Sequence, residues 1–95
     1  AKKFVKKLKH AEIEWRKAND LLRASALPVL DESNPHVAED LAKIREGKAL
    51  SPVLLVRGDG ARGRPLIIAD GYHRICASWH TDENAPIPSR LVSND

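Results

Sequence analysis

The feature of this sequence that most constrains its fold is an unbroken aliphatic run, Val53–Val56, that directly follows Pro52. Aliphatic and β-branched residues without polar alternation are typical of a strand that is buried on both faces. A second run of this kind, residues 65–69, comes after a glycine-rich segment, residues 58–63. We therefore expect an antiparallel hairpin with a loose loop. The loop lacks the Lys-Ser/Thr ending of a Walker phosphate loop and leads into a strand.

Helical patterns lie on both sides of this hairpin. Asn34-Pro35 is a capping residue followed by a proline, and Gly47 is a terminator, so we expect a helix between them with three buried positions: Val37, Leu41 and Ile44. Residues 72–80 place four further side chains on one helical face: Tyr72, Ile75, Cys76 and Trp79. With a closing strand over residues 87–92, the pattern predicts a small α+β domain with a mixed or antiparallel sheet of about three or four strands and about three helices.

The first quarter of the chain predicts an amphipathic helix, because apolar residues recur at alternating spacings of four and three: Phe4, Leu8, Ala11, Trp15, Ala18 and Leu22. We expect this stripe, Trp15 included, to be buried against the domain or against a second copy in a homodimer. Residues 12–15 also alternate as a strand would. Leu27-Pro28 ends the segment. The chain is thus divided into a basic amphipathic helical segment, residues 1–26, and a domain, residues 27–95.

Positive charge is concentrated at the start of the chain. The first ten residues hold no acid and five of the 16 basic residues, which leaves 11 basic groups against 13 acidic ones in the rest. A cluster of this kind is typical of a solvated face or of a weak contact with nucleic acid. The residues concerned are Lys2, Lys3, Lys6, Lys7 and Lys9.

Length and composition restrict the class of protein. The 95 residues, 42% of them hydrophobic, match one globular domain. No apolar stretch reaches the roughly eighteen residues of a membrane span, and the charged N-terminus does not resemble a secretion signal. The single cysteine, Cys76, cannot form an internal disulfide. We expect a cytoplasmic protein with no membrane partner.

The candidate site is the segment Asp70-Gly71-Tyr72-His73-Arg74, where a buried strand is expected to lead into a helix. Free N–H groups and the helix dipole favour an anion at such a turn. Gly71 permits close backbone approach, Arg74 offers donors suited to phosphate, and His73 can move a proton near neutral pH. The segment therefore predicts a site for a phosphate-bearing ligand, with Asp70 and His73 as candidate catalytic residues.

A purely structural interpretation of the same residues stays open. Asp70 then caps the helix, Arg74 pairs with an acid, and His73 is a surface residue. His73, Cys76 and His80 have spacings that allow a shared metal ion, but Cys76 falls on the apolar face and no fourth ligand is apparent. We expect no protein-held metal site.

The order and spacing of these parts resemble the superfamily shared by sulfiredoxin and the N-terminal domain of the ParB partition protein. The likeness covers about residues 27–92: Leu27-Pro28, the helix up to Gly47, Ser51-Pro52 with the strand after it, the motif from Asp70 to Arg74, and the closing segment from Ile87. The resemblance implies a small α/β fold whose Gly-x-His-Arg turn binds nucleotide phosphates, ATP in sulfiredoxins and CTP in ParB.

By the same resemblance, Gly71, His73 and Arg74 take the phosphate-binding positions beside Tyr72, and Lys48 and Ser51 lie where neighbouring loops approach the nucleotide. The implied ligand is a nucleotide or a phosphorylated small molecule, with a nucleoside triphosphate and Mg²⁺ as the possible cofactor pair. Tyr72 stands where sulfiredoxins have their cysteine, so repair of sulfinic acids is not expected.

Two alternatives belong to other functional classes. Relatives include free-serine kinases, so a phosphotransferase or a nuclease-type enzyme would use Asp70 and a divalent metal. A DNA-associated accessory protein would instead use the lysine-rich N-terminus. The sequence leaves open whether any reaction follows binding.

Overall fold

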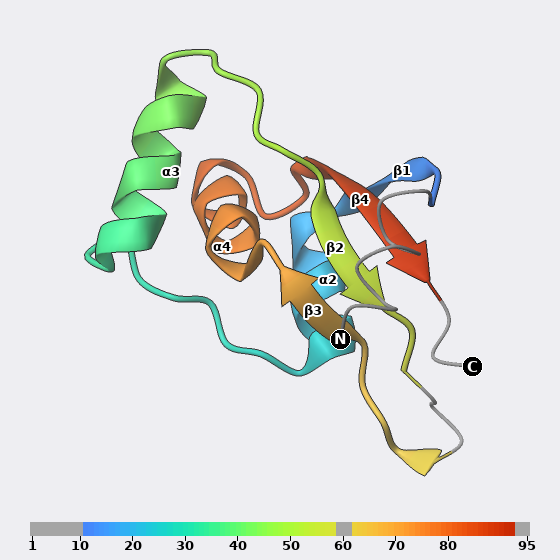
Figure 1. Ribbon diagram of the computed structural model, residues 1–95. Coiled ribbons are helices and arrows are strands. Elements are labelled where there is room, and N and C mark those ends of the chain that lie inside the picture. The colour runs from blue at the N-terminus through green and yellow to red at the C-terminus, as the bar shows by residue number, and fades with distance from the viewer. Residues whose placement is uncertain (1–10, 59–61, 93–95) are drawn as a thin grey trace.

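The computed structural model describes residues 11–58 and 62–92, and within them the chain forms three helices and one four-stranded mixed sheet (Figure 1). This confirms the predicted α+β class. None of the helices in these two segments is long and apolar enough to cross a bilayer. In chain order the elements are β1 (Ile13–Lys17), α2 (Ala18–Ser25), α3 (Pro35–Arg45), β2 (Val53–Val56), β3 (Ile67–Asp70), α4 (Tyr72–Thr81) and β4 (Pro86–Val92).

The sheet has the strand order β1-β4-β2-β3. β2 is antiparallel to β3 and parallel to β4, and β4 is antiparallel to β1. The hairpin predicted from the two aliphatic runs is therefore confirmed, and β2 is an inner strand that is largely buried. β3, however, is an edge strand, and three of its four residues are exposed. The expectation that a buried strand leads into the Asp70 turn was wrong. Among the described strands, β3 pairs only with β2 and stays largely exposed.

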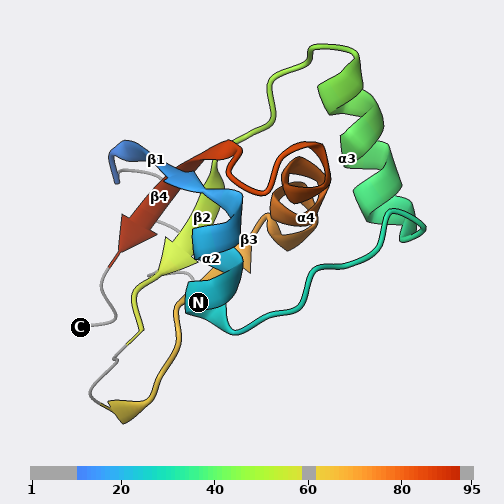
Figure 2. The same cartoon turned by 180° about the vertical axis from the view of Figure 1, so that it is seen from behind.

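α2 and α4 lie side by side against the sheet, and α3 packs on the far side of α4, as both views show (Figure 2). α4 is the central helix, and Ile75, Cys76 and Ala77 have no exposed surface. The core also includes apolar residues of α2, α3, β2 and β4: Ala18, Leu21, Leu22, Val37, Leu41, Val53, Leu55 and Ile87.

The first quarter of the chain departs from the continuous helix that its spacing predicts. Residues 13–17 form β1, and the helix begins only at Ala18. Pairing with β4 decides the outcome, because the register joins Ile13 to Arg90 and Lys17 to Pro86. The strand-like alternation of residues 12–15 was the correct local signal. Trp15 is 67% exposed, so its predicted place in the core was also wrong.

The remaining parts of the N-terminal prediction have different outcomes. Ala18 and Leu22 of the stripe are buried, now on α2 and within the same core as the rest of the fold. Phe4, Leu8 and the five lysines of the basic cluster lie outside the described residues.

Both predicted helix starts are confirmed. The side chain of Asn34 accepts hydrogen bonds from the backbone N–H groups of His36 and Val37 at 3.0 and 3.2 Å, which caps α3. α4 follows Gly71, whose φ of +104° lies in the region that only glycine adopts without strain. A Cβ atom at this position would lie 2.5 Å from Cγ1 of Val53, a buried residue of β2. The strand-to-helix turn is therefore tightly packed on the inner strand.

Replacing Gly71 with alanine should destabilise the fold strongly. Gly71→Ala combines backbone strain with a clash against a buried side chain, so we expect a loss of about 2–4 kcal/mol in the free energy of unfolding. Gly47→Ala is the matched control, because Gly47 has a φ of +78° and open space around it. It should lose only about 1 kcal/mol. Urea unfolding of both variants tests this, and equal losses would contradict the packing argument.

Candidate functional site

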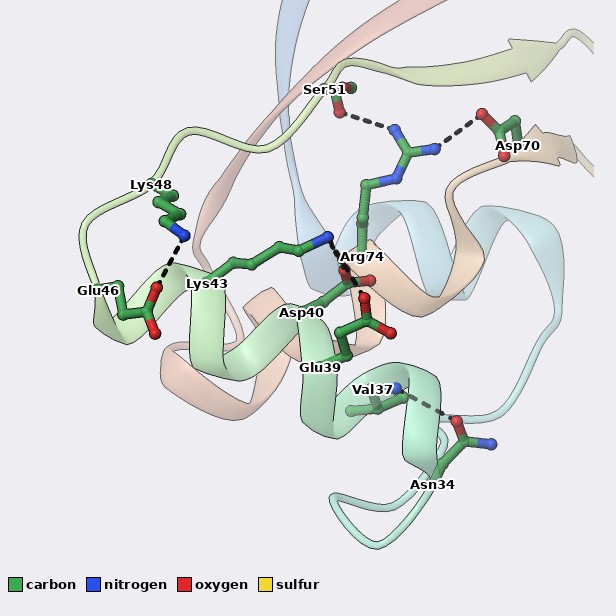
Figure 3. A network of polar contacts seen from close by, with 10 residues as sticks. All are labelled: Asn34, Val37, Glu39, Asp40, Lys43, Glu46, Lys48, Ser51, Asp70 and Arg74. Carbon is green, nitrogen blue, oxygen red and sulfur yellow. Dashed lines mark hydrogen bonds and ion pairs between the residues drawn. The ribbon is translucent and has the colours of Figure 1, made fainter.

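Arg74 is the most connected polar residue of the candidate site (Figure 3). Its Nη1 donates to the backbone carbonyls of Ser51 and Pro52 at 2.8 and 3.0 Å, and its Nη2 donates to Asp70 at 2.7 Å. These bonds use three of the five N–H donors of a guanidinium. Its side chain is only 18% exposed. Arg74 therefore links the first turn of α4 to the end of β3 and to the segment that enters β2.

Asp70 is paired rather than free. Its carboxylate holds the guanidinium of Arg74 across one helical turn, while 60% of its own side chain stays exposed. The structural interpretation of an Arg74–acid pair is thus realised within the motif. Among residues 11–58 and 62–92, no three His, Cys, Asp or Glu side chains are arranged to hold a metal ion.

His73 and Tyr72 lie away from Arg74. The half-buried His73 ring has its centroid 4.8 Å from that of His36 on α3 and 5.9 Å from that of Tyr72. The hydroxyl of Tyr72 donates to the carbonyl of Pro28. These two residues therefore connect α4 to α3 and to the segment before it, and the motif divides into a histidine side and an arginine side.

On the arginine side, the structure contains an apolar cavity of about 270 Å³. Its apolar walls come from β1, α3, the segment after α3, β2, the residue before β4, and β4 itself: Trp15, Ile44, Ala49, Leu50, Val53, Ala85, Pro86, Ile87 and Pro88. Its polar lining consists of Lys48, Ser51, Arg74, Ser78 and Thr81. A small number of polar groups in an apolar hollow is the usual composition of a small-molecule site.

The cavity brings together three residues that the sequence placed in the candidate site, Lys48, Ser51 and Arg74. Lys48 is largely exposed, and its Nζ lies 3.1 Å from a carboxylate oxygen of Glu46 (Figure 3). Asp70, Gly71, Tyr72 and His73 do not line it. The arginine end of the predicted site thus lies at the cavity, whereas the rest of the motif shapes the turn beside it.

Sequence reasoning missed the far wall of this cavity. Trp15 and residues 85–88 contribute to it because β1 pairs with β4, and that pairing joins opposite ends of the chain. The alternation of residues 12–15 was the one local signal for β1. It could not show that Trp15 faces a cavity.

Cys76 lies at the centre of a second polar cluster, on the side of α4 that faces the segment before α3. The backbone N–H of Leu30 donates to Sγ of Cys76 at 3.4 Å, and Nε2 of His80 donates to the carbonyl of Leu30 at 2.8 Å. Burial raises the pKa of the Cys76 thiol, and burial also raises the pKa of Tyr72. The cluster therefore holds a neutral thiol and ties the chain before α3 to α4.

Comparisons with known proteins assign no family and no function to this chain. The chain matches no protein-family model, no curated protein and no solved structure. The likeness to ParB and sulfiredoxin therefore remains a prediction.

Removing Arg74 should cost far more stability than neutralising its partner. Arg74→Ala leaves two carbonyls without their donor, so we expect a loss of about 2–3 kcal/mol. Asp70→Asn removes only an exposed charge and should lose less than about 1 kcal/mol. Arg74→Lys should recover only part of the loss, because an ammonium lacks the planar fork of donors. Urea unfolding measures all three, and equal losses for Arg74→Ala and Asp70→Asn would show that the ion pair, not the carbonyl bonds, dominates.

Raising the pH should destabilise the fold through Cys76. Because its pKa is higher in the folded than in the unfolded chain, the unfolded chain loses the thiol proton first, and stability falls as the pH rises above the ordinary thiol pKa of about 8.5. The free energy of unfolding measured between about pH 8 and pH 9.5 should decline in the parent. Cys76→Ala should show a flatter profile over this interval, and an unchanged slope would exclude the thiol as the source.

Proposed function

We propose that this chain binds a small organic anion, a nucleotide or another phosphate-bearing molecule, in the cavity bordered by Lys48, Ser51 and Arg74. The observation that carries the proposal is that these three residues, separated along the sequence, meet at one apolar cavity. An apolar hollow accommodates the organic part of such a ligand, and cations at its border attract the charged part.

The two cations contribute differently. Lys48 is exposed, and its pair with the exposed Glu46 is of the kind that adds little to stability. A ligand phosphate therefore displaces Glu46 from Lys48 at small cost. Arg74 already serves three acceptors, so it supports the ligand with its remaining donors while keeping the wall of the cavity in place. In this proposal Lys48 supplies the main attraction for the anion.

The enzyme alternative is less well supported by the geometry. A phosphotransferase or nuclease would need the Asp70 carboxylate for a metal ion or an acceptor hydroxyl, and that carboxylate is bonded to Arg74. If Mg²⁺ accompanies the ligand, phosphate oxygens and water supply most of its coordination, as they do for Mg²⁺ in general. Binding without a reaction is the function that the described residues favour.

Nucleotide binding should be visible as stabilisation. A ligand present at one hundred times its dissociation constant stabilises the folded state by about 2.7 kcal/mol, which raises the midpoint of thermal unfolding by several degrees in a domain of this size. We would measure the midpoint against ATP, CTP, GTP, ADP and inorganic phosphate, with and without magnesium. At least one nucleotide should raise it more than phosphate does.

Lysine variants locate the binding site. Lys48→Ala should weaken binding about tenfold, equivalent to about 1.4 kcal/mol. Lys43→Ala is the matched control, because Lys43 is also an exposed lysine paired with a glutamate, at 3.7 Å from Glu39, but lies outside the cavity lining. Equal weakening in both variants would mean that charge alone attracts the nucleotide. No shift with any nucleotide would exclude nucleotides as the ligand, and no shift with phosphate as well would refute the proposed function.

A further inference from the structure

We infer that the ligand carries a planar ring, and that this ring lies against the indole of Trp15. The inference rests on the proposed function and extends it: it names the class of ligand, a molecule that joins an aromatic or heteroaromatic ring to an anionic group. It also assigns a binding role to a residue outside the Asp70–Arg74 motif.

Trp15 is unusual because its large side chain is exposed yet belongs to a cavity wall. It is 67% exposed on the edge strand β1 and pairs with Pro88 of β4. Ile13 on the same strand is 45% exposed but lines no part of the cavity. Trp15 also borders a second hollow beside α2, with Leu21 and Leu66. Most of its side-chain surface is exposed, so the ring can meet a ligand that occupies the cavity on the arginine side. A tryptophan ring in this position offers a rigid face for stacking.

The size of the cavity limits what enters it. About 270 Å³ lies just below the range of about 300–1,000 Å³ that is typical of ligand pockets. This volume accommodates one ring system with an attached sugar and leaves several phosphates outside. The ring therefore enters the apolar space beside Trp15, and the anionic group stays at the border with Lys48.

The chemistry of the lining agrees with this orientation. Proline and aliphatic side chains next to Trp15, including Pro86 and Pro88, provide no charge for a phosphate. The two cations of the lining come from other elements, Lys48 from the segment after α3 and Arg74 from α4. One cavity thus presents an aromatic apolar wall and a cationic border, which matches a ligand with one flat apolar part and one anionic part.

The test compares ligands that carry one or both of these parts. The probes are the four common ribonucleoside monophosphates, the corresponding nucleosides, and ribose 5-phosphate, each titrated calorimetrically into the parent chain. We expect at least one nucleotide to bind more tightly than both its nucleoside and ribose 5-phosphate. Trp15→Val, which retains strand propensity, should weaken that nucleotide about tenfold and leave ribose 5-phosphate unchanged.

Three further variants make the result specific to the ring. Trp15→Phe should bind the nucleotide within about threefold of the parent, because an aromatic face is kept. Ile13→Val, at an exposed apolar position of the same strand, should have no effect. In Trp79→Phe the remaining tryptophan of the two in the chain is Trp15, so nucleotide should quench its fluorescence saturably. The calorimetric comparison stands even if Trp79→Phe does not fold.

The outcomes separate this inference from the proposed function. If nucleotide and ribose 5-phosphate bind the parent equally, or Trp15→Val binds nucleotide as the parent does, the ring contact is wrong while anion binding stands. If none of the probes binds the parent, the proposed function itself fails. If Trp15→Val instead abolishes self-association seen by sedimentation and leaves nucleotide affinity unchanged, Trp15 is a protein contact and the inference is overturned.

Discussion

The Arg74 guanidinium connects three segments of the chain: the end of β3, the start of α4 and the segment that precedes β2. β3 ends at Asp70, α4 begins two residues later, and the segment at Ser51 and Pro52 enters β2. The two carbonyls that it binds belong to the residues just before β2, and the Arg74 side chain donates to both. The close contact of Gly71 with Val53 then fixes the same turn sterically. Polar and steric constraints thus act on one short stretch of backbone.

This arrangement gives the motif two functions that the sequence alone does not separate. Tyr72 and His73 contact the region of α3 and the segment before it, and so orient the helices. Arg74 points to the other side and contributes to a cavity with Lys48 and Ser51. One half of this compact motif therefore orients helices, and the other half lines the cavity.

Local signals predicted much of the fold. The aliphatic run of β2, the Asn34 cap of α3 and the Gly71 start of α4 depend on nearby residues, and each appears where it was expected. The predictions failed where the outcome depends on a partner strand. β3 is exposed and Trp15 lies on a strand because of their places in the sheet order, which hydrophobic spacing does not encode. Lys48 and Ser51 entered the candidate site through the resemblance, whereas no sequence signal placed Trp15 or residues 85–88 beside them.

The cavity is lined by residues from near both ends of the described chain, so its formation depends on the order of folding. One wall includes Trp15 and another includes residues 85–88, so the site forms only after contacts of large sequence separation are made. β1 is an edge strand, and edge elements are generally among the first to open in local unfolding. Opening of β1 would remove the Trp15 wall while leaving β2 and α4 packed. A ligand bound in the cavity would therefore stabilise the pairing of β1 with the rest of the sheet.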